Sequence, residues 1–147
     1  MNRMVIGLTG DSGSGKTTIA NFLVEKGFYK ISIKDKVREM ALHFFSNDEI
    51  DKEENVIITE MRYKGLVMSP SYWLNLALIS VSNHTHLIVI DDVHKAEAVN
   101  GNIRMYQVVR PHHSASKWDN IPDVEVILND SDLDSLQQKI ENLYNSI

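Results

Sequence analysis

The sequence predicts a three-layer α/β fold in which a parallel sheet of about five strands carries helices on both faces. Short apolar runs alternate along the chain with segments of helical spacing, and a glycine-rich stretch follows the first run. A later apolar run ends in two aspartates. The alternation favours a parallel sheet, because two parallel strands are joined by a crossover that is usually a helix. At 147 residues, the chain is expected to form one domain, 1–147.

The first part of the chain is expected to supply two strands and two helices. The apolar run 3–9 predicts a strand buried on both faces. Apolar residues at helical spacing predict a helix over 17–26, which Gly27 would end. Alternating residues over 28–33 indicate a second strand, and 34–45 has the spacing of a second helix.

The middle of the chain is less regular. The polar stretch 46–55 indicates an exposed connection, and 56–70 fits a helix or a loop. Pro70 is expected to open a clear helix, since proline suits a first turn. The apolar run 86–92 predicts another buried strand, and a short helical piece is expected over 95–100.

The last part of the chain is expected to complete the sheet. Strand-like runs occupy 103–110 and 124–129, and the segment 110–122 between them is interpreted as a lid. The closing segment predicts a helix that Ser131 or Asp132 would cap.

A phosphate-binding loop is the most specific motif. Gly10, Gly15, Lys16 and Thr17 fit the pattern G-x-x-x-x-G-K-[ST] between a predicted strand and a predicted helix, which indicates a P-loop NTPase fold. Glycines let backbone N–H groups face phosphate oxygens, and the helix N-terminus adds positive charge. Lys16 is expected to reach the phosphates of ATP, and the Thr17 hydroxyl to bind Mg²⁺. The predicted cofactor-binding residues are Gly10, Asp11, Ser12, Gly13, Ser14, Gly15, Lys16, Thr17 and Thr18.

Two carboxylates follow the buried strand over 86–92. Asp91 and Asp92 would lie at the carboxyl end of this strand, where open α/β sheets bind ligands. Such a carboxylate can hold Mg²⁺ through water or orient a phosphate acceptor. The position alone leaves open which of the two aspartates has which role; Thr17 and Asp91 are the residues expected to hold the metal.

Cationic side chains are needed to offset the charge of a transferring phosphate. Arg38 and Arg62 lie where an acceptor phosphate needs a clamp, and Arg110 ends a predicted strand. Trp73 could stack on a base or belong to the core. The candidate cations are Lys34, Lys36, Arg38, Arg62, Arg104 and Arg110.

Composition and missing motifs exclude several classes. A net charge of −5 argues against a nucleic-acid partner, and the absence of cysteine excludes disulfides and thiolate metal sites. The sequence contains neither the N-K-x-D nor the D-x-x-G pattern of a regulatory GTPase, which argues against that class. No apolar run is long enough to span a membrane, so we expect a cytoplasmic protein with no membrane partner. Small-molecule nucleotides are the expected partners, and the helix around Trp73 leaves a homodimer open.

Six segments occur in an order that resembles the phage deoxynucleoside monophosphate kinases, a branch of the nucleoside monophosphate kinases. They are "GLTGDSGSGKTTIANFL", "YKISIKDKVREM", "SPSYWLNLAL", "LIVIDDVHKAEAV", "YQVVRP" and "VILNDSDLDSLQQKI". The resemblance implies transfer of the γ-phosphate of ATP, with Mg²⁺, to a deoxynucleoside monophosphate in the cytoplasm of a host cell. By position it implies catalytic residues at Lys16, Asp92 and Arg110, and substrate-binding residues at Asp35, Arg38, Arg62, Trp73, Asp92 and Glu97.

The chain also departs from the pattern of that family. His94 stands where the family has arginine, and the segment 110–120 lacks the family's H-x-S-E. Two alternatives therefore stay open. The acceptor could be a hydroxyl, as in dephospho-CoA or shikimate-type kinases, or the chain could be a nucleotide-binding module that does not catalyse transfer.

Overall fold

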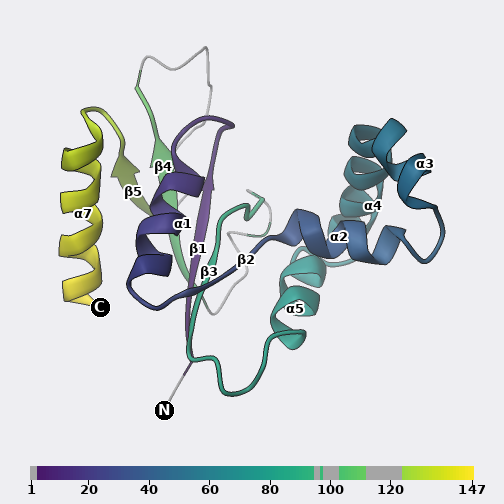
Figure 1. Ribbon diagram of the computed structural model, residues 1–147, viewed down its shortest axis with the longest axis horizontal. Helices are drawn as coiled ribbons and strands as arrows, with labels where there is room; N and C mark the ends of the chain where they lie inside the picture. The colour runs from purple at the N-terminus through teal and green to yellow at the C-terminus, as the bar shows by residue number, and fades with distance from the viewer. Residues whose placement is uncertain (1–2, 95–96, 98–102, 112–123) are drawn as a thin grey trace.

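A five-stranded parallel sheet forms the centre of the computed structural model, which describes residues 3–94, 97, 103–111 and 124–147. The strand order is β2-β3-β1-β4-β5, with every neighbouring pair parallel (Figure 1). This arrangement confirms the predicted fold class. The strands are β1 (Met4–Gly10), β2 (Tyr29–Ile31), β3 (Leu87–Ile90), β4 (Arg104–Val109) and β5 (Glu125–Leu128).

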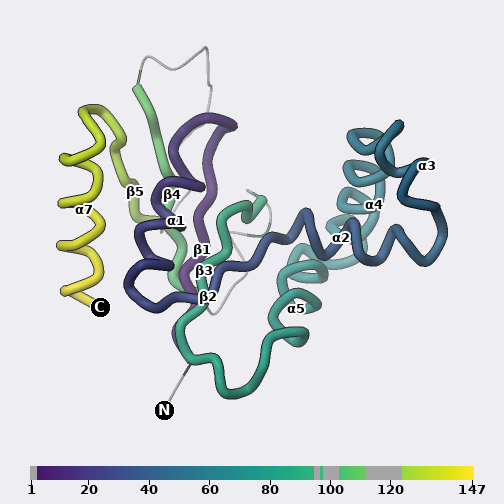
Figure 2. The backbone as a smooth tube through the Cα atoms, viewed as in Figure 1, coloured from purple at the N-terminus to yellow at the C-terminus, as the bar shows by residue number. Residues whose placement is uncertain are grey.

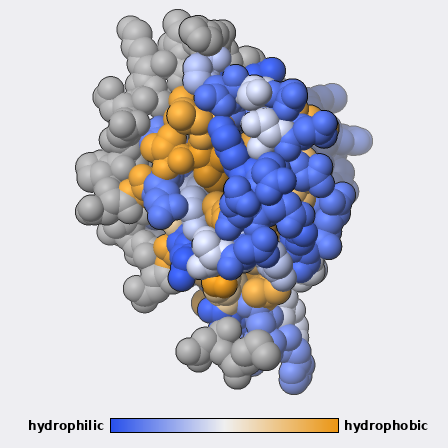
Figure 3. Space-filling view, turned by 90° about the vertical axis from the view of Figure 1, so that its left-hand side faces the viewer, coloured by the Kyte–Doolittle hydropathy of each residue, from blue (hydrophilic) through white to orange (hydrophobic). Residues whose placement is uncertain are grey.

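Helices cover both faces of the sheet. Helices α1 and α7 lie on one side, and α2 to α5 lie on the other, as the traces of Figures 1 and 2 show. Figure 3, viewed from the α7 side, shows mainly hydrophilic side chains over this part of the surface. The helices are α1 (Lys16–Glu25), α2 (Ile33–Ala41), α3 (Asn47–Lys52), α4 (Glu54–Met68), α5 (Tyr72–Ile79) and α7 (Leu133–Ser146).

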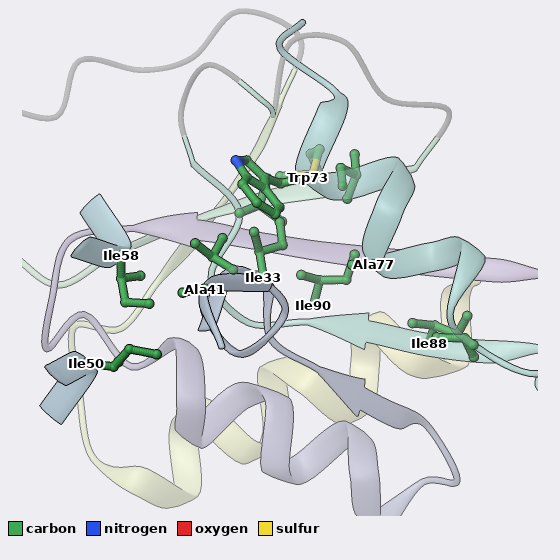
Figure 4. Packing of buried hydrophobic residues seen from close by; sticks show 13 residues of the cluster. Ile33, Ala41, Ile50, Ile58, Trp73, Ala77, Ile88 and Ile90 are labelled. Carbon is green, nitrogen blue, oxygen red and sulfur yellow. The ribbon is translucent and has the colours of Figure 1, made fainter. Parts of the chain in front are cut away.

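Strand β3 separates two apolar clusters because its side chains alternate between the faces. Val89 packs with residues of α1 and α7, whereas Ile88 and Ile90 pack with α2, α4 and α5 (Figure 4). All three side chains are fully buried. Burial on both faces explains why this strand reads as a continuous apolar run.

The middle of the chain contains more helix than its sequence indicates. The stretch 46–55 is largely exposed, as expected, but it is mainly helical, because it contains α3 and the start of α4. The Ser46 hydroxyl accepts from the backbone N–H of Glu49, and Ile50 is buried against α2 and α4. Residues 56–70 are largely helical within α4. A capping serine and one apolar residue therefore suffice for a short helix in a very polar sequence.

Several predicted boundaries move by one to four residues. The second strand ends at Ile31 because Ser32 is the N-cap of α2, and α2 itself ends at Ala41. Helix α5 begins at Tyr72, not at Pro70, with Ser71 as its N-cap. Asp132 caps α7, accepting from the N–H of Ser135. The predicted helical piece over 95–100, apart from Glu97, and most of the lid over 110–122 lie outside the described residues.

The carboxyl ends of the strands bring the site together. Gly10 at the end of β1 pairs with Val108 of β4, and Gly7 pairs with Ile90, directly before Asp91. Because all strands run in the same direction, the loops that follow them share one edge of the sheet. The phosphate-binding loop, the two aspartates, Arg110 and the segment after β5 therefore lie at this edge.

Candidate functional site

The phosphate-binding loop has the backbone conformation that its glycines predict. Gly10, Gly13 and Gly15 have positive φ angles of 143°, 79° and 113°. Gly15 is the N-cap of α1, so the loop opens directly onto a helix N-terminus. The Ser14 hydroxyl is buried and has no hydrogen-bond partner among the described residues. A buried hydroxyl that lacks a hydrogen-bond partner could bind a phosphate oxygen, so this loop fits a phosphate ligand.

The Lys16 ammonium lies at the phosphate-binding loop, where the phosphates of ATP are expected to bind. Its Nζ donates to the carbonyl oxygen of Gly10 at 2.5 Å. Burial lowers the pKa of Lys16, while Asp92, Asp11 and Asp91 raise it. A phosphate oxygen carries a negative charge and would therefore be a stronger acceptor for the Lys16 ammonium than the neutral carbonyl oxygen of Gly10.

A cavity of about 390 Å³ adjoins the loop. It lies between the start of α1, the end of β4 and the segment that leads into α7. Arg110, a predicted catalytic residue, lines this cavity next to Lys16 and Thr17. Its lining residues are Gly13, Gly15, Lys16, Thr17, Thr18, Arg110, Asn129, Ser131, Leu133 and Leu136.

Asn129 is a site residue that the motif analysis missed. Its side-chain N–H donates to the carbonyl oxygen of Ser14 at 2.9 Å, and its backbone N–H donates to Val109 at 2.8 Å. Its position directly after β5 was the available indication, because the end of every parallel strand faces this edge of the sheet.

Asp92 caps helix α2. Its carboxylate accepts from the backbone N–H groups of Ile33 at 2.7 Å and Lys34 at 2.8 Å, and from the Ser32 hydroxyl at 3.0 Å. These donors satisfy the start of the helix and place a negative charge at its positive end. Asp92 lies at the carboxyl end of β3, as predicted, and it also positions the start of α2.

Asp91 has a different environment. Its carboxylate lies 3.6 Å from the Lys30 ammonium, and burial together with the neighbouring Asp92 raises its pKa. Within the described ranges, no three acidic or histidine side chains gather closely enough to hold a metal by themselves. Mg²⁺ commonly takes one or two protein ligands and completes its shell with phosphates and water. Thr17 and Asp91 fit that use.

Arg62 connects α4 to the end of β3. One guanidinium nitrogen donates to the carbonyl oxygen of Asp92 at 2.6 Å and to the carboxylate of Glu97 at 2.8 Å. A second nitrogen lies 3.6 Å from the Asp92 carboxylate. Glu97 is fully buried and also accepts from the backbone N–H of His94. The structure thus brings together three of the predicted substrate-binding residues.

A second cavity, of about 530 Å³, lies against these residues. It is bounded by α4 and by the start of α2, and its walls combine apolar side chains with the cations Lys34 and Arg62. Its lining residues are Lys34, Glu54, Asn55, Ile58, Thr59, Arg62, Tyr63, Leu66, Val67 and His94.

Only Arg62 of the predicted substrate-binding residues lines one of these two cavities, and three of the others lie apart from the Arg62, Asp92 and Glu97 cluster. Arg38 is paired with Asp51 at 2.7 Å and lies near Glu54, and Asp35 is exposed in the first turn of α2. Trp73 is 3% exposed, and its indole N–H donates to the carbonyl oxygen of Arg62 at 3.1 Å. Figure 4 shows the indole within the apolar cluster. Of the two places that the sequence allows for Trp73, the structure shows the core, because protein encloses the ring.

The fold and the loop define a kinase-like P-loop protein. The family model described as "AAA domain" matches residues 6–109, so the chain belongs to this family. Over 65 residues it is 40% identical to dephospho-CoA kinase of Fusobacterium nucleatum, a match that covers 38% of this chain and 34% of that protein. The chain thus spans about a third of the length of this curated relative.

Solved structures agree on the fold. The APS kinase of Mycobacterium tuberculosis superposes with a TM-score of 0.50 at 18% identity, over 98% of each chain. At that identity the similarity concerns the fold alone. Among the helices of the described residues, none combines the length and apolar character needed to cross a membrane.

Proposed function

We propose that this chain is an ATP-dependent kinase that transfers the γ-phosphate of ATP to a nucleoside monophosphate, with deoxynucleotides preferred, giving the diphosphate. The observation that carries the proposal is that Asp92 interacts with one cation from each of the two cavities. Lys16 lines the first cavity and Arg62 lines the second. Asp92 acts electrostatically on Lys16 and pairs with Arg62, so one carboxylate links the charges of both cavities.

The second cavity suits an anionic acceptor with a flat apolar part. Arg62 and Lys34 supply positive charge, and Ile58, Tyr63 and Leu66 supply apolar wall. Both cations are paired with carboxylates, Lys34 with Glu54 at 3.0 Å and Arg62 with Glu97. These pairs neutralise the charge of both cations while no phosphate is bound. The planar guanidinium of Arg62 can bind two phosphate oxygens at once.

The chemistry needs positioning and charge stabilisation more than proton transfer. An oxygen of the acceptor phosphate forms a bond to the γ-phosphorus, the bond to the β–γ bridging oxygen breaks, and ADP leaves with the electron pair. An ionised phosphate has no proton to lose at the attacking oxygen. This agrees with Asp92, whose carboxylate already accepts from three donors at the start of α2.

Mg²⁺, when bound with ATP, neutralises charge on the β- and γ-phosphates. Thr17 and Asp91 are the residues proposed to hold it, directly and through water. Lys16 would neutralise the transferring group from the protein side, and Arg110 would approach the nucleotide from the end of β4.

A hydroxyl acceptor is the second candidate, because the curated relative is a dephospho-CoA kinase. A hydroxyl must lose a proton during transfer, so this reaction needs a carboxylate that can accept one. We assign this step to Asp91, since burial raises the pKa of its carboxyl group. This candidate therefore assigns Asp91 a role that the first does not require.

The test is ADP release from Mg·ATP with a panel of acceptors. The panel contains the four common deoxynucleoside monophosphates, their ribose counterparts and dephospho-CoA, each compared with background ATP hydrolysis. Stimulation by one or more monophosphates supports the proposal and identifies the base. Stimulation by dephospho-CoA alone selects the second candidate. Tight ATP binding with no acceptor stimulated would contradict both and favour a nucleotide-binding module.

A further inference from the structure

Asn129 makes two hydrogen bonds to segments that border the nucleotide cavity. Its side chain holds the carbonyl oxygen of Ser14, one residue before the α1 N-cap. Its backbone N–H extends the β4–β5 pairing by donating to Val109, the residue before Arg110. Ser131, two residues later, lines the same cavity. One asparagine, at the start of the segment that leads into α7, thus joins the phosphate-binding loop to the end of β4.

The contact with the loop is close as well as polar. A Cβ atom placed on Gly15 would lie 2.6 Å from the Asn129 amide nitrogen, a distance that real side chains do not tolerate. Gly15 also has a φ of 113°, which disfavours any side chain. The Asn129 amide group therefore lies directly against Gly15, and the positive φ is what requires a glycine there.

Holding the Ser14 carbonyl affects how the loop binds phosphate. A peptide unit is planar, so fixing the Ser14 carbonyl oxygen also fixes the direction of the Gly15 N–H. That N–H belongs to the group of loop N–H groups that face a phosphate. Without the amide donor, the peptide unit is free to rotate, and part of the binding energy is used to restore its orientation.

We infer that Asn129 is a positioning residue that orients the Ser14–Gly15 peptide of the phosphate-binding loop for nucleotide binding. The inference rests on the proposed binding of Mg·ATP and adds a residue from outside the motif. Asn129 acts through the loop backbone, so its removal should weaken nucleotide binding for every acceptor to a similar extent.

The test measures Mg·ATP binding by isothermal titration calorimetry at pH 7.5, without any acceptor. Asn129→Leu keeps the side-chain size but removes the donor, and Asn129→Ala replaces it if the leucine variant does not fold. Asn142→Leu, on the exposed side of α7, is the matched control. We expect Kd to rise about tenfold for the Asn129 variant and to stay unchanged for the control.

Two further variants separate positioning from general damage. Asn129→Asp is ionised at pH 7.5, so it loses the amide donor and places a carboxylate against the Ser14 carbonyl oxygen. It should therefore bind Mg·ATP at least as weakly as Asn129→Leu, whereas Asn129→Gln, which keeps an amide donor, should recover part of the affinity. Equal affinity of the wild type and the leucine variant would overturn the inference while leaving the proposed function intact. A wild-type protein that does not bind Mg·ATP would overturn both.

Discussion

The Asp92 carboxylate lies 2.7 Å from the backbone nitrogen of Ile33, and this contact fixes the start of α2 to the end of β3. The two residues are 59 positions apart in the chain. A carboxylate that looks like a metal or acceptor ligand in the sequence thus holds a helix in place. Since α2 borders the second cavity through Lys34, this contact also shapes the proposed acceptor site.

Replacing Asp92 should reduce stability as well as activity. We expect Asp92→Ala to lower the free energy of unfolding by about 1–2 kcal/mol, because α2 loses its capping acceptor. Urea denaturation at neutral pH measures the effect. Asp35→Ala, in the exposed first turn of the same helix, is the control. An Asp92→Ala protein with unchanged stability would show that the cap contributes nothing.

Lys16 should matter for transfer and little for folding. Lys16→Met is expected to reduce the rate of phosphoryl transfer by about 100-fold or more, since it removes a cation from the transferring phosphate. Its melting temperature should change little, because the described contact of its ammonium is a single loop carbonyl oxygen. The exposed Lys52→Met serves as the control in both measurements. Undiminished transfer by Lys16→Met would refute the proposed mechanism.

Arg62 and Glu97 should behave as a buried pair. Arg62→Gln leaves the fully buried Glu97 without its ion partner, so we expect a loss of about 3–5 kcal/mol in unfolding free energy. Adding Glu97→Gln should recover part of that loss, because the uncompensated charge is removed. Arg38→Gln, which breaks a surface pair with Asp51, should cost about 1 kcal/mol or less. Additive effects of the Arg62 and Glu97 changes would contradict the pairing.

The stability of an Asp91→Asn variant should depend on pH in a defined direction. Burial and Asp92 raise the pKa of Asp91 above its ordinary 3.8, so the folded state disfavours the charged form. The contribution of Asp91 to stability is therefore lost as pH rises through the range between the unfolded and folded pKa values. Without nucleotide, Asp91→Asn should melt at a higher temperature than the wild type at pH 7, and this advantage should shrink toward pH 3.

Asp130 provides a control of opposite sign for that experiment. A hydrogen bond from Lys139 lowers the pKa of Asp130, so Asp130→Asn should not stabilise the protein at pH 7. With Mg²⁺ and ATP present, Asp91→Asn should require more Mg²⁺ for half-maximal transfer. An Asp91→Asn variant that is less stable than the wild type at pH 7 would argue against the raised pKa.

Gly65 tests the close packing of α4 on Trp73. A Cβ atom at Gly65 would overlap the indole nitrogen of Trp73. On an open helix face, Gly65→Ala would stabilise by up to about 1 kcal/mol, whereas overpacking costs about 1–3 kcal/mol. We therefore expect a net loss in the wild-type background and a smaller loss, or a gain, when Trp73 is replaced by Phe. The same sign in both backgrounds would show that the indole is not the obstacle.

Much of the fold could be predicted because it depends on local patterns. The buried strands β1 and β3 were predicted from continuous apolar runs, and α1 and α7 from helical spacing. The phosphate-binding loop was predicted from the spacing of four residues between a strand and a helix. In these segments the neighbours along the chain decide the structure, so a short window of sequence is sufficient.

The middle of the chain shows where such patterns fail. Helix α3 lies in the most polar stretch, and its place depends on the Ser46 cap and on burial of Ile50 against other helices. Helix α4 buries Ile58 but exposes Tyr63, Val67 and Met68, so its apolar residues follow no single stripe. Tertiary contacts, not local preference, select the helix in both segments.

The sequence by itself determined that this protein has a parallel α/β sheet with a phosphate-binding loop, because both follow from residue spacing within short segments. Only the tertiary structure decided what the polar residues around that loop do. It assigned Asp92 to α2, enclosed Trp73 in the core and brought Asn129 to Ser14 across 115 positions. The physical reason is that hydrogen bonds and close packing between distant segments depend on how the elements meet, which no local spacing encodes.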